Sequence, residues 1–235
     1  MSFEVEFTKE TIDNYLKEFG KEFRRRNGTK THADIILIGG ASILINYDFR
    51  NMTTDADAVI KASSVMKEAI HCVADKFNLP RDWLNDDFKR TSSFSEKLFK
   101  VAKRYRTFSN ILHVWTVAAE YLIAMKLMSG RQYKYDLSDV VGILWEHEKK
   151  SLPIEKETIM KAVKTLYNKP LPANSLEFIN DVFASGNYEK LYQDSREIER
   201  EGRNIVDTFT AENPTVKGVS VDEIIEQARR KKPLM

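Results

Sequence analysis

The spacing of apolar residues in the first sixty positions predicts alternating helices and strands. Apolar side chains recur at helical spacing over residues 8–26, and an unbroken apolar run over residues 35–38 predicts a buried strand. A short helix is expected over residues 41–47, followed by a second strand over residues 53–60. Helices and strands that alternate in this way are typical of an α/β domain.

The rest of the chain divides into a part that continues the sheet and a part that is helical throughout. Helical spacing predicts a helix over residues 63–77, and the apolar stretches 98–102 and 111–117 predict two further strands. Residues 117–128 are apolar nearly all round, which predicts a helix buried in a core. The sequence therefore predicts an α/β domain over residues 1–150 and a C-terminal helical region over residues 151–235.

The C-terminal region is predicted to contain four helices, at residues 154–167, 175–184, 188–209 and 221–232. The third of these carries apolar residues at spacings near seven among many acids and bases: Leu191, Ile198, Ile205 and Phe209. This pattern predicts one packed stripe on a helix whose remaining surface is solvated.

Two adjacent glycines end the first predicted strand. Gly39 and Gly40 allow a sharp backbone turn, after which a helix begins with N–H groups that have no acceptor inside the helix. Such a helix start is a natural phosphate site. Ser42 in the first turn could bind phosphate as well, although a serine there can equally bond the local backbone.

Two aspartates lie two residues apart on the second predicted strand. Alternate residues of a strand share a face, so Thr53, Asp55 and Asp57 are expected to project to the same side. Carboxylates placed so close repel each other unless a cation lies between them. Mg²⁺ suits such a pair because it takes one or two carboxylates and completes its shell with water and substrate phosphates.

The order of these features resembles the nucleotidyltransferase-fold superfamily, which includes DNA polymerase beta and the aminoglycoside nucleotidyltransferases. Its signature is a strand, a Gly-Gly or Gly-Ser turn that opens a helix, and an Asp-x-Asp strand. The likeness is greatest to small bacterial members, including the toxins of abortive-infection type IV systems. Their patterns Gly-Gly-x-x-Leu and Arg-x-Thr-x-Asp-x-Asp are matched, with one extra residue before the threonine, by Gly39, Gly40, Leu44, Arg50, Thr53, Asp55 and Asp57.

A second segment, residues 120–140, looks like the Glu-x-Leu-x-x-x-Lys-Leu-x-x-x-Arg-x-x-x-x-Asp-x-x-Asp pattern of the same families. The resemblance implies that Lys126 and Arg131 reach the triphosphate and that Asp136 or Asp139 accepts a proton. Structural alternatives stay open. The Lys126 ammonium could extend to solvent along its alkyl chain, and the two aspartates could cap a helix predicted over residues 137–149.

The chain departs from the superfamily at one point. The third metal carboxylate usually lies on a later strand, but residues 97–119 contain no Asp or Glu. Either this branch works with two metal carboxylates and recruits a later acid, or the chain has lost its activity.

The resemblance implies a nucleotidyltransferase-like mixed sheet with flanking helices and a Mg²⁺-dependent transfer of a nucleoside monophosphate from a triphosphate to a hydroxyl. Asp55 and Asp57 would bind the metal, while Gly39, Gly40, Ser42, Arg50 and Thr53 would bind the nucleotide. The acceptor could be transfer RNA or a protein, with the chain acting as a toxin paired with an antitoxin, or a small molecule. The alternative is a degenerate module that binds a nucleotide or RNA and acts through a protein partner.

Composition narrows these possibilities only slightly. The net charge of +2 creates no global attraction to a polyanion, so any contact with nucleic acid must be local. Residues 97–106 mix cations and aromatics as RNA-binding surfaces do, or form the exposed face of two strands. The one cysteine excludes an internal disulfide, and no run is long enough to cross a membrane, so we expect a cytoplasmic protein.

Overall fold

The computed structural model describes residues 6–54, 56–60, 64–131, 134–213, 221, 223–225 and 228 of the chain. Two compact units make up the chain. The first, here called the sheet unit, comprises Met1–Met125 and Glu157–Pro170, and the second, the helical unit, comprises Lys126–Lys156 and Leu171–Met235. The domain boundary at residue 150 stays a prediction.

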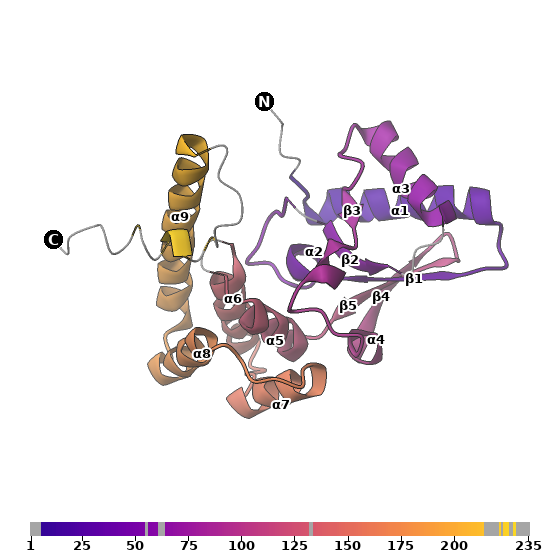
Figure 1. The fold of residues 1–235 in the computed structure, drawn as a ribbon. Coiled ribbons are helices and arrows are strands. Elements are labelled where there is room, and N and C mark those ends of the chain that lie inside the picture. The colour runs from indigo at the N-terminus through magenta and orange to yellow at the C-terminus, as the bar shows by residue number, and fades with distance from the viewer. Residues whose placement is uncertain are drawn as a thin grey trace. The chain divides into compact units, whose positions relative to one another are not determined.

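The sheet unit is built on a five-stranded mixed sheet with the strand order β3-β2-β1-β5-β4 (Figure 1). The central strand β1 pairs antiparallel with β2 and parallel with β5, while β2 pairs parallel with β3, and β4 pairs antiparallel with β5. The strands are β1 (Ala33–Leu37), β2 (Ala56–Ile60), β3 (Leu84–Asn85), β4 (Ala102–Phe108) and β5 (Leu112–Val117). The predicted α/β class with a mixed sheet is confirmed.

Helices α1 (Lys9–Asn27) and α3 (Ser64–Phe77) pack together against one face of this sheet. The first begins with a capping box, in which Thr8 and Thr11 satisfy each other's backbone N–H groups. Its buried stripe meets inward-facing strand residues in one continuous core, which includes Ile12, Leu16, Phe19, Ile35, Leu37, Ala58, Met66 and Val114. Burial of these side chains is the main force that holds the sheet unit together.

Helix α2 (Gly39–Asn46) begins two residues before the predicted start, at the first glycine itself. The strand after it is shorter than predicted, because β2 begins at Ala56. Thr53 instead forms an isolated antiparallel bridge with Phe7, in which each backbone N–H donates to the other's carbonyl at 2.7 and 3.0 Å. The backbone of Thr53 is thus held by Phe7 of the N-terminal segment.

The predicted strand at residues 98–102 is wrong. Leu98–Val101 form the short helix α4, and the strand β4 lies directly after it. Within β4 the side chain of Phe108 alone is buried, because this strand lies at the edge of the sheet. An edge strand with so little burial lacks the apolar run that marks a central strand.

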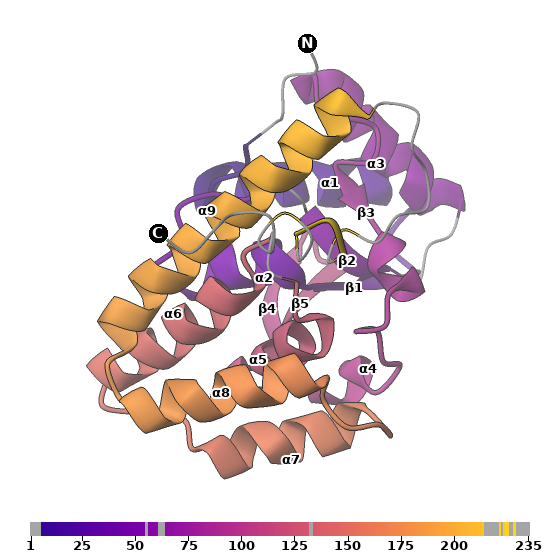
Figure 2. The ribbon, with the colours of Figure 1, turned by 60° about the vertical axis from the view of Figure 1, so that its left-hand side comes forward.

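The helical unit contains α6 (Asp136–Lys149), α8 (Ala173–Ser185) and α9 (Tyr188–Glu212). Helices α6 and α9 lie side by side (Figure 2). Helix α5 (Ala119–Ser129) is divided between the units, because the helical unit begins at Lys126. All of α7 (Lys156–Leu166) except its first residue belongs to the sheet unit. Much of the predicted helix at residues 221–232 lies outside the described residues.

No helix in the described part of the chain combines the length and the apolar character that a membrane crossing needs.

Candidate nucleotide site

The glycine turn after β1 is shaped so that only glycine fits. Gly39 has a φ of +55°, a conformation that residues with a side chain rarely adopt. A Cβ atom on Gly40 would lie 3.0 Å from Nη2 of Arg50 and would overlap Oγ1 of Thr53. Arg50 Nη2 in turn donates to Thr53 Oγ1 at 3.3 Å. The structure therefore brings Gly39, Gly40, Arg50 and Thr53 together, and their role in nucleotide binding stays a prediction.

Asp57 faces the same turn from the neighbouring strand. Its carboxylate oxygen Oδ2 lies 3.5 Å from the position that a Cβ on Gly39 would occupy. Its side chain is half-buried, and its main-chain carbonyl accepts a hydrogen bond from the N–H of Ile38 at 3.0 Å. Asp55 lies outside the described residues, so its place beside Asp57 stays a prediction.

The start of α2 is electrostatically suited to an anion. Within the described part of the chain no side chain caps it, and its first turn contains no acidic residue. The first N–H groups of a helix carry partial positive charge and have no acceptor within the helix. With the Arg50 guanidinium beside Gly40, this end of α2 offers donors that could hold phosphate oxygens.

The residues present fit a magnesium ion that is held partly by substrate. The Asp57 side chain is half-buried, and its Oδ2 lies beside the backbone of Gly39. Among the described residues, no group of three or more His, Cys, Asp or Glu could hold a metal. Mg²⁺ does not need such a cage, because it commonly keeps one or two carboxylates, waters and phosphate oxygens.

Ser42 has a different environment from the one expected for a phosphate ligand. It is fully buried, and its Oγ accepts from the N–H of Val117 and from Nδ2 of Asn46, both at 3.4 Å. A role for its hydroxyl in phosphate binding stays a prediction. The strand that Val117 ends, β5, lies next to β1 and carries no carboxylate, as the sequence indicated.

The second motif forms a buried ion network in the helical unit, consisting of Lys126, Arg131, Asp136 and Asp139. The Lys126 ammonium lies 2.9 Å from Oδ1 of Asp136 and 2.8 Å from Oδ2 of Asp139. Arg131 Nε donates to the other oxygen of Asp136 at 2.9 Å. Only 11% of the Lys126 side chain and none of the Asp136 side chain is exposed. The four residues are thus brought together as charge-matched partners at the start of α6.

The charges of this network determine the ionisation of Asp136. Burial by itself would raise the pKa of its carboxyl, but the positive charges and hydrogen bonds of Lys126 and Arg131 outweigh that effect. The pKa of Asp136 is therefore held well below its usual range, and the residue is ionised at neutral pH. The ionised Asp136 carboxylate pairs with Lys126 and Arg131 and so holds both cations in place.

Sequence reasoning missed a third carboxylate beside this network, that of Glu199. Its Oε1 accepts from the N–H groups of Leu137 and Ser138 at 2.8 and 3.0 Å, and its Oε2 accepts from Oγ of Ser138 at 2.6 Å. Glu199 is completely buried, which raises the pKa of its carboxyl to about 7 even though these donors oppose the change.

The buried face of α9 also differs from the prediction. Its buried residues are Ser195, Glu199 and Gly202, whereas Ile198 is 40% exposed. Of the predicted stripe, Leu191, Ile205 and Phe209 are half-buried, and the prediction is wrong for Ile198. The fully buried face of the helix instead includes Glu199, which binds the start of α6. The one available signal was Ser195, Glu199 and Gly202 at helical spacing, which a search for apolar residues ignores.

Basic residues of β4 are engaged with other side chains of the sheet unit. The Arg104 guanidinium lies 5.5 Å from the centre of the Trp115 ring, and Arg106 pairs with Asp13 at 2.7 Å. Lys103 is exposed. Nucleic-acid binding by residues 97–106 stays a prediction.

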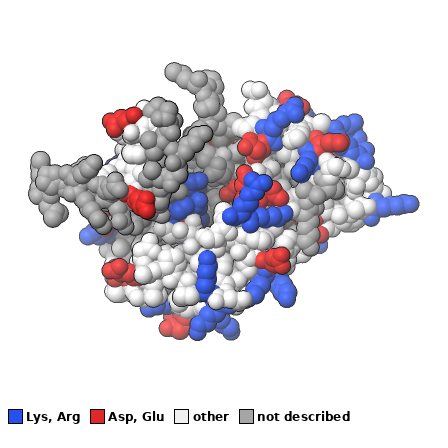
Figure 3. Space-filling model, in the orientation of Figure 1, with Lys and Arg blue, Asp and Glu red and all other residues white. Residues whose placement is uncertain are grey.

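Across the face drawn in Figure 3, acidic and basic side chains are interspersed, in keeping with the small net charge.

Three arginines of α9 line a groove in the helical unit. The groove has a volume of about 540 Å³ and is lined by Tyr135, Tyr192, Gln193, Arg196, Glu197, Arg200, Arg203 and Asn204. The guanidinium groups of Arg196 and Arg203 lie 4.3 and 4.6 Å from the centre of the Tyr135 ring.

Comparison with known proteins agrees with this geometry. The model of a family described as "Nucleotidyltransferase of unknown function (DUF6036)" matches residues 14–170, a range that contains the glycine turn, Asp57 and the buried ion network. Neither a curated protein nor a solved structure matches the chain. The predicted superfamily is confirmed, while the likeness to the abortive-infection branch stays a prediction. The chain belongs to this family of nucleotidyltransferases of unknown function.

Proposed function

We propose that the chain transfers a nucleoside monophosphate from a nucleoside triphosphate to a hydroxyl group in a Mg²⁺-dependent reaction. The observation that carries the proposal is the approach of Asp57 to the Gly39–Gly40 turn at the uncapped start of α2. A carboxylate for a cation and backbone donors for phosphate meet there within a few ångströms. The family assignment gives the same class of reaction.

Each residue of this site has a distinct role in the proposal. Asp57, together with Asp55, would hold Mg²⁺, which when bound supplies positive charge to the phosphate oxygens of the triphosphate. Gly40, which has no Cβ, lets Arg50 and Thr53 lie against its backbone, and Arg50 would bind those oxygens while Thr53 orients its guanidinium. Ser42 accepts both of its hydrogen bonds, so its O–H could still donate, but the side chain would first have to become accessible to the phosphate.

The buried ion network has a more limited part. A triphosphate contact by Lys126 would require its ammonium to exchange one of its two carboxylate partners. Arg131, with 35% of its side chain exposed, is the cation of the network with more access to solvent. Asp136 or Asp139 would act as proton acceptor only in a state where Lys126 had moved. The observed contacts favour the alternative role of fixing the start of α6.

The nucleotide site can be tested by calorimetric titration with each of the four nucleoside triphosphates, with and without Mg²⁺. We expect Mg²⁺-dependent binding that weakens about 30-fold in Asp57→Asn, because a neutral amide is a poorer ligand for a divalent cation. Asp34→Asn is the matched control, since Asp34 is exposed on β1 and accepts from Trp115 Nε1 at 2.7 Å, which an amide oxygen can also do. Binding that is absent, or equal in wild type and Asp57→Asn, would overturn the proposed site.

For the acceptor we propose an RNA, such as a transfer RNA, and the chain would then act as a toxin with an antitoxin partner. The groove on α9 supports this choice. Arg196, Arg200 and Arg203 recur at helical spacing beside Tyr135 and Tyr192, and among the described residues that line the groove Glu197 is the one acid. Arginines along a strip with aromatic rings suit the phosphates and bases of RNA.

Replacing Arg200 or Arg203 with glutamine should weaken the binding of a fluorescently labelled transfer RNA. Each change removes about one phosphate contact, so the slope of log Kd against log salt should fall by about 1 in anisotropy titrations. Arg25→Gln, on the exposed side of α1, should leave the slope unchanged. Wild-type and variant slopes that agree would argue against this groove as the RNA site.

A degenerate binding module is the second candidate, and the lack of a carboxylate on β5 favours it. Pyrophosphate release separates the two functions. If Mg²⁺-dependent binding at Asp57 is found but no pyrophosphate is released in the presence of cellular RNA or protein, the binding module is the better description.

A further inference from the structure

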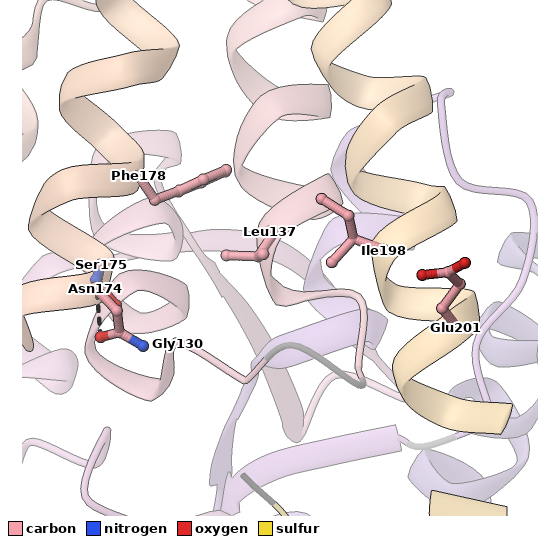
Figure 4. A pocket seen from close by; sticks show the side chains of 7 residues that line it. All are labelled: Gly130, Leu137, Asn174, Ser175, Phe178, Ile198 and Glu201. Carbon is pink, nitrogen blue, oxygen red and sulfur yellow. Dashed lines mark hydrogen bonds between the residues drawn. The ribbon is translucent and has the colours of Figure 1, made fainter. Parts of the chain in front are cut away.

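The helical unit contains a pocket of about 340 Å³ that no step of the proposed reaction uses (Figure 4). It lies among the residue that follows α5, the start of α6, the first turns of α8 and the middle of α9. Figure 4 shows Phe178 of α8 directed toward Leu137 of α6, with Ile198 of α9 on the other side of Leu137. The remaining lining residues are Gly130, Asn174, Ser175 and Glu201.

Ser175 leaves a polar atom without a partner in this pocket. Its side chain is only 2% exposed, and within the described part of the chain its hydroxyl has no hydrogen-bond partner. A buried hydroxyl without a partner is unfavourable, typically by ~1–3 kcal/mol, and needs an explanation. A ligand that bonds to the hydroxyl would remove this cost.

Gly130 leaves the space that the Ser175 hydroxyl occupies. A Cβ at this position would lie 2.5 Å from the Ser175 oxygen, and the φ of +59° also disfavours residues with side chains. The glycine is therefore required on two counts, by its backbone conformation and by the hydroxyl beside it.

The groups beside Ser175 are hydrogen-bond donors. Helix α8 begins after Pro172 with no side-chain cap from any residue that the structure describes, and its first turn has no acidic residue. Asn174 already uses its Oδ1 to accept the N–H of Ser175 at 2.9 Å, so its Nδ2 offers donors only. With the partial positive charge of a helix start, these groups favour an acceptor that carries negative charge.

The rest of the pocket decides which acceptor fits. Leu137, Phe178 and Ile198 form apolar walls, and none of the lining residues that the structure describes is a lysine or arginine. Glu201, three residues after Ile198, adds a negative charge at another part of the lining. A phosphate with up to two charges would lack a matching cation there, whereas a single carboxylate needs only the donors at α8.

We propose that this pocket binds a small apolar molecule that carries one carboxylate, with the carboxylate at Ser175 and the apolar body against Leu137, Phe178 and Ile198. The pocket volume lies at the lower end of the range for small-molecule sites. The ligand is distinct from the nucleotide, and its binding does not depend on the proposed transferase activity.

Phenylacetate is a suitable probe, with phenylacetamide as its neutral counterpart and inorganic phosphate as a competing anion. Calorimetric titration of the full chain should show saturable binding of phenylacetate, at least about tenfold tighter than that of the amide, since hydrogen bonds to a charged group are the stronger ones. Ser175→Ala should weaken phenylacetate binding about tenfold. Ser185→Ala, at the exposed end of α8, is the matched control and should bind as wild type.

Two further measurements keep the outcomes distinct. Asp57→Asn should bind phenylacetate as wild type does, so a failed nucleotide site would leave this proposal standing. Ser175→Ala removes an unsatisfied hydroxyl and should unfold at an equal or higher temperature, which excludes misfolding as the cause of lost binding. Failure to bind phenylacetate, equal binding by Ser175→Ala, or tighter binding of phosphate would each overturn the proposal.

Discussion

Replacing Lys126 with methionine is expected to lower the free energy of unfolding by about 3–5 kcal/mol, because it removes one partner of a buried ion network. The ammonium lies within 3 Å of carboxylate oxygens of both Asp136 and Asp139, whose side chains are 0% and 3% exposed. Methionine has a similar shape but no charge, so two buried carboxylates would share the charge of Arg131 alone among the network's cations. A pair broken on one side costs more than the pair contributes when intact.

Urea unfolding followed by far-ultraviolet circular dichroism would measure this loss. Trp145 in α6 adds a fluorescence signal from the helical unit itself. Lys161→Met, at an exposed position of α7, is the control and should change stability by less than about 0.5 kcal/mol. The triple variant Lys126→Met, Asp136→Asn, Asp139→Asn should recover part of the loss, since it removes the unmatched charges. A single variant as stable as wild type would contradict the charge-matched arrangement.

Raising the pH from 5 to 8 should lower the free energy of unfolding by up to about 3 kcal/mol, through Glu199. The pKa of this carboxyl is raised from 4.5 to about 7 in the folded state. The folded state therefore holds the proton more tightly than the unfolded state does. The resulting stabilisation is complete below the unfolded pKa and is lost as the pH rises through the folded one. A difference of one between the folded and unfolded pKa values corresponds to about 1.4 kcal/mol.

Glu199→Gln should abolish this pH dependence between 5 and 8. The amide is a neutral copy of the protonated acid, with an oxygen that can accept from Leu137 and Ser138 and an NH₂ group that can donate to the Ser138 hydroxyl. Glu197→Gln, an exposed change on the same helix, should keep the wild-type profile. Asp136 acts in the opposite sense, because the pKa of its carboxyl is lowered in the folded state. The stabilisation that it contributes is present above the unfolded pKa and is lost as the pH falls toward the folded one. A wild-type stability that stays level from pH 5 to 8 would refute the role given to Glu199.

The sequence predicted those features of the fold and site that depend on residues close together along the chain. The central strands and most helices follow from local apolar spacing, and the Gly39–Gly40 turn follows from backbone freedom, so all of these could be read directly. Edge strand β4 could not, because it buries little beyond Phe108. Glu199 was hidden for another reason. Its hydrogen-bond donors lie about sixty residues earlier in the chain. In the sequence, Glu199 is therefore one charged residue among many on a long helix.

The hydrogen bonds from Leu137 and Ser138 to Glu199 also constrain the order in which the chain can mature during synthesis. Helix α6 begins after Tyr135, which provides no side-chain cap of its own, and Glu199 supplies that cap from α9. A nascent chain that ends before α9 therefore contains α6 with an incomplete beginning. The family match ends at residue 170, so Glu199 lies outside the matched segment. The helical unit should thus reach its final structure only after α9 has left the ribosome.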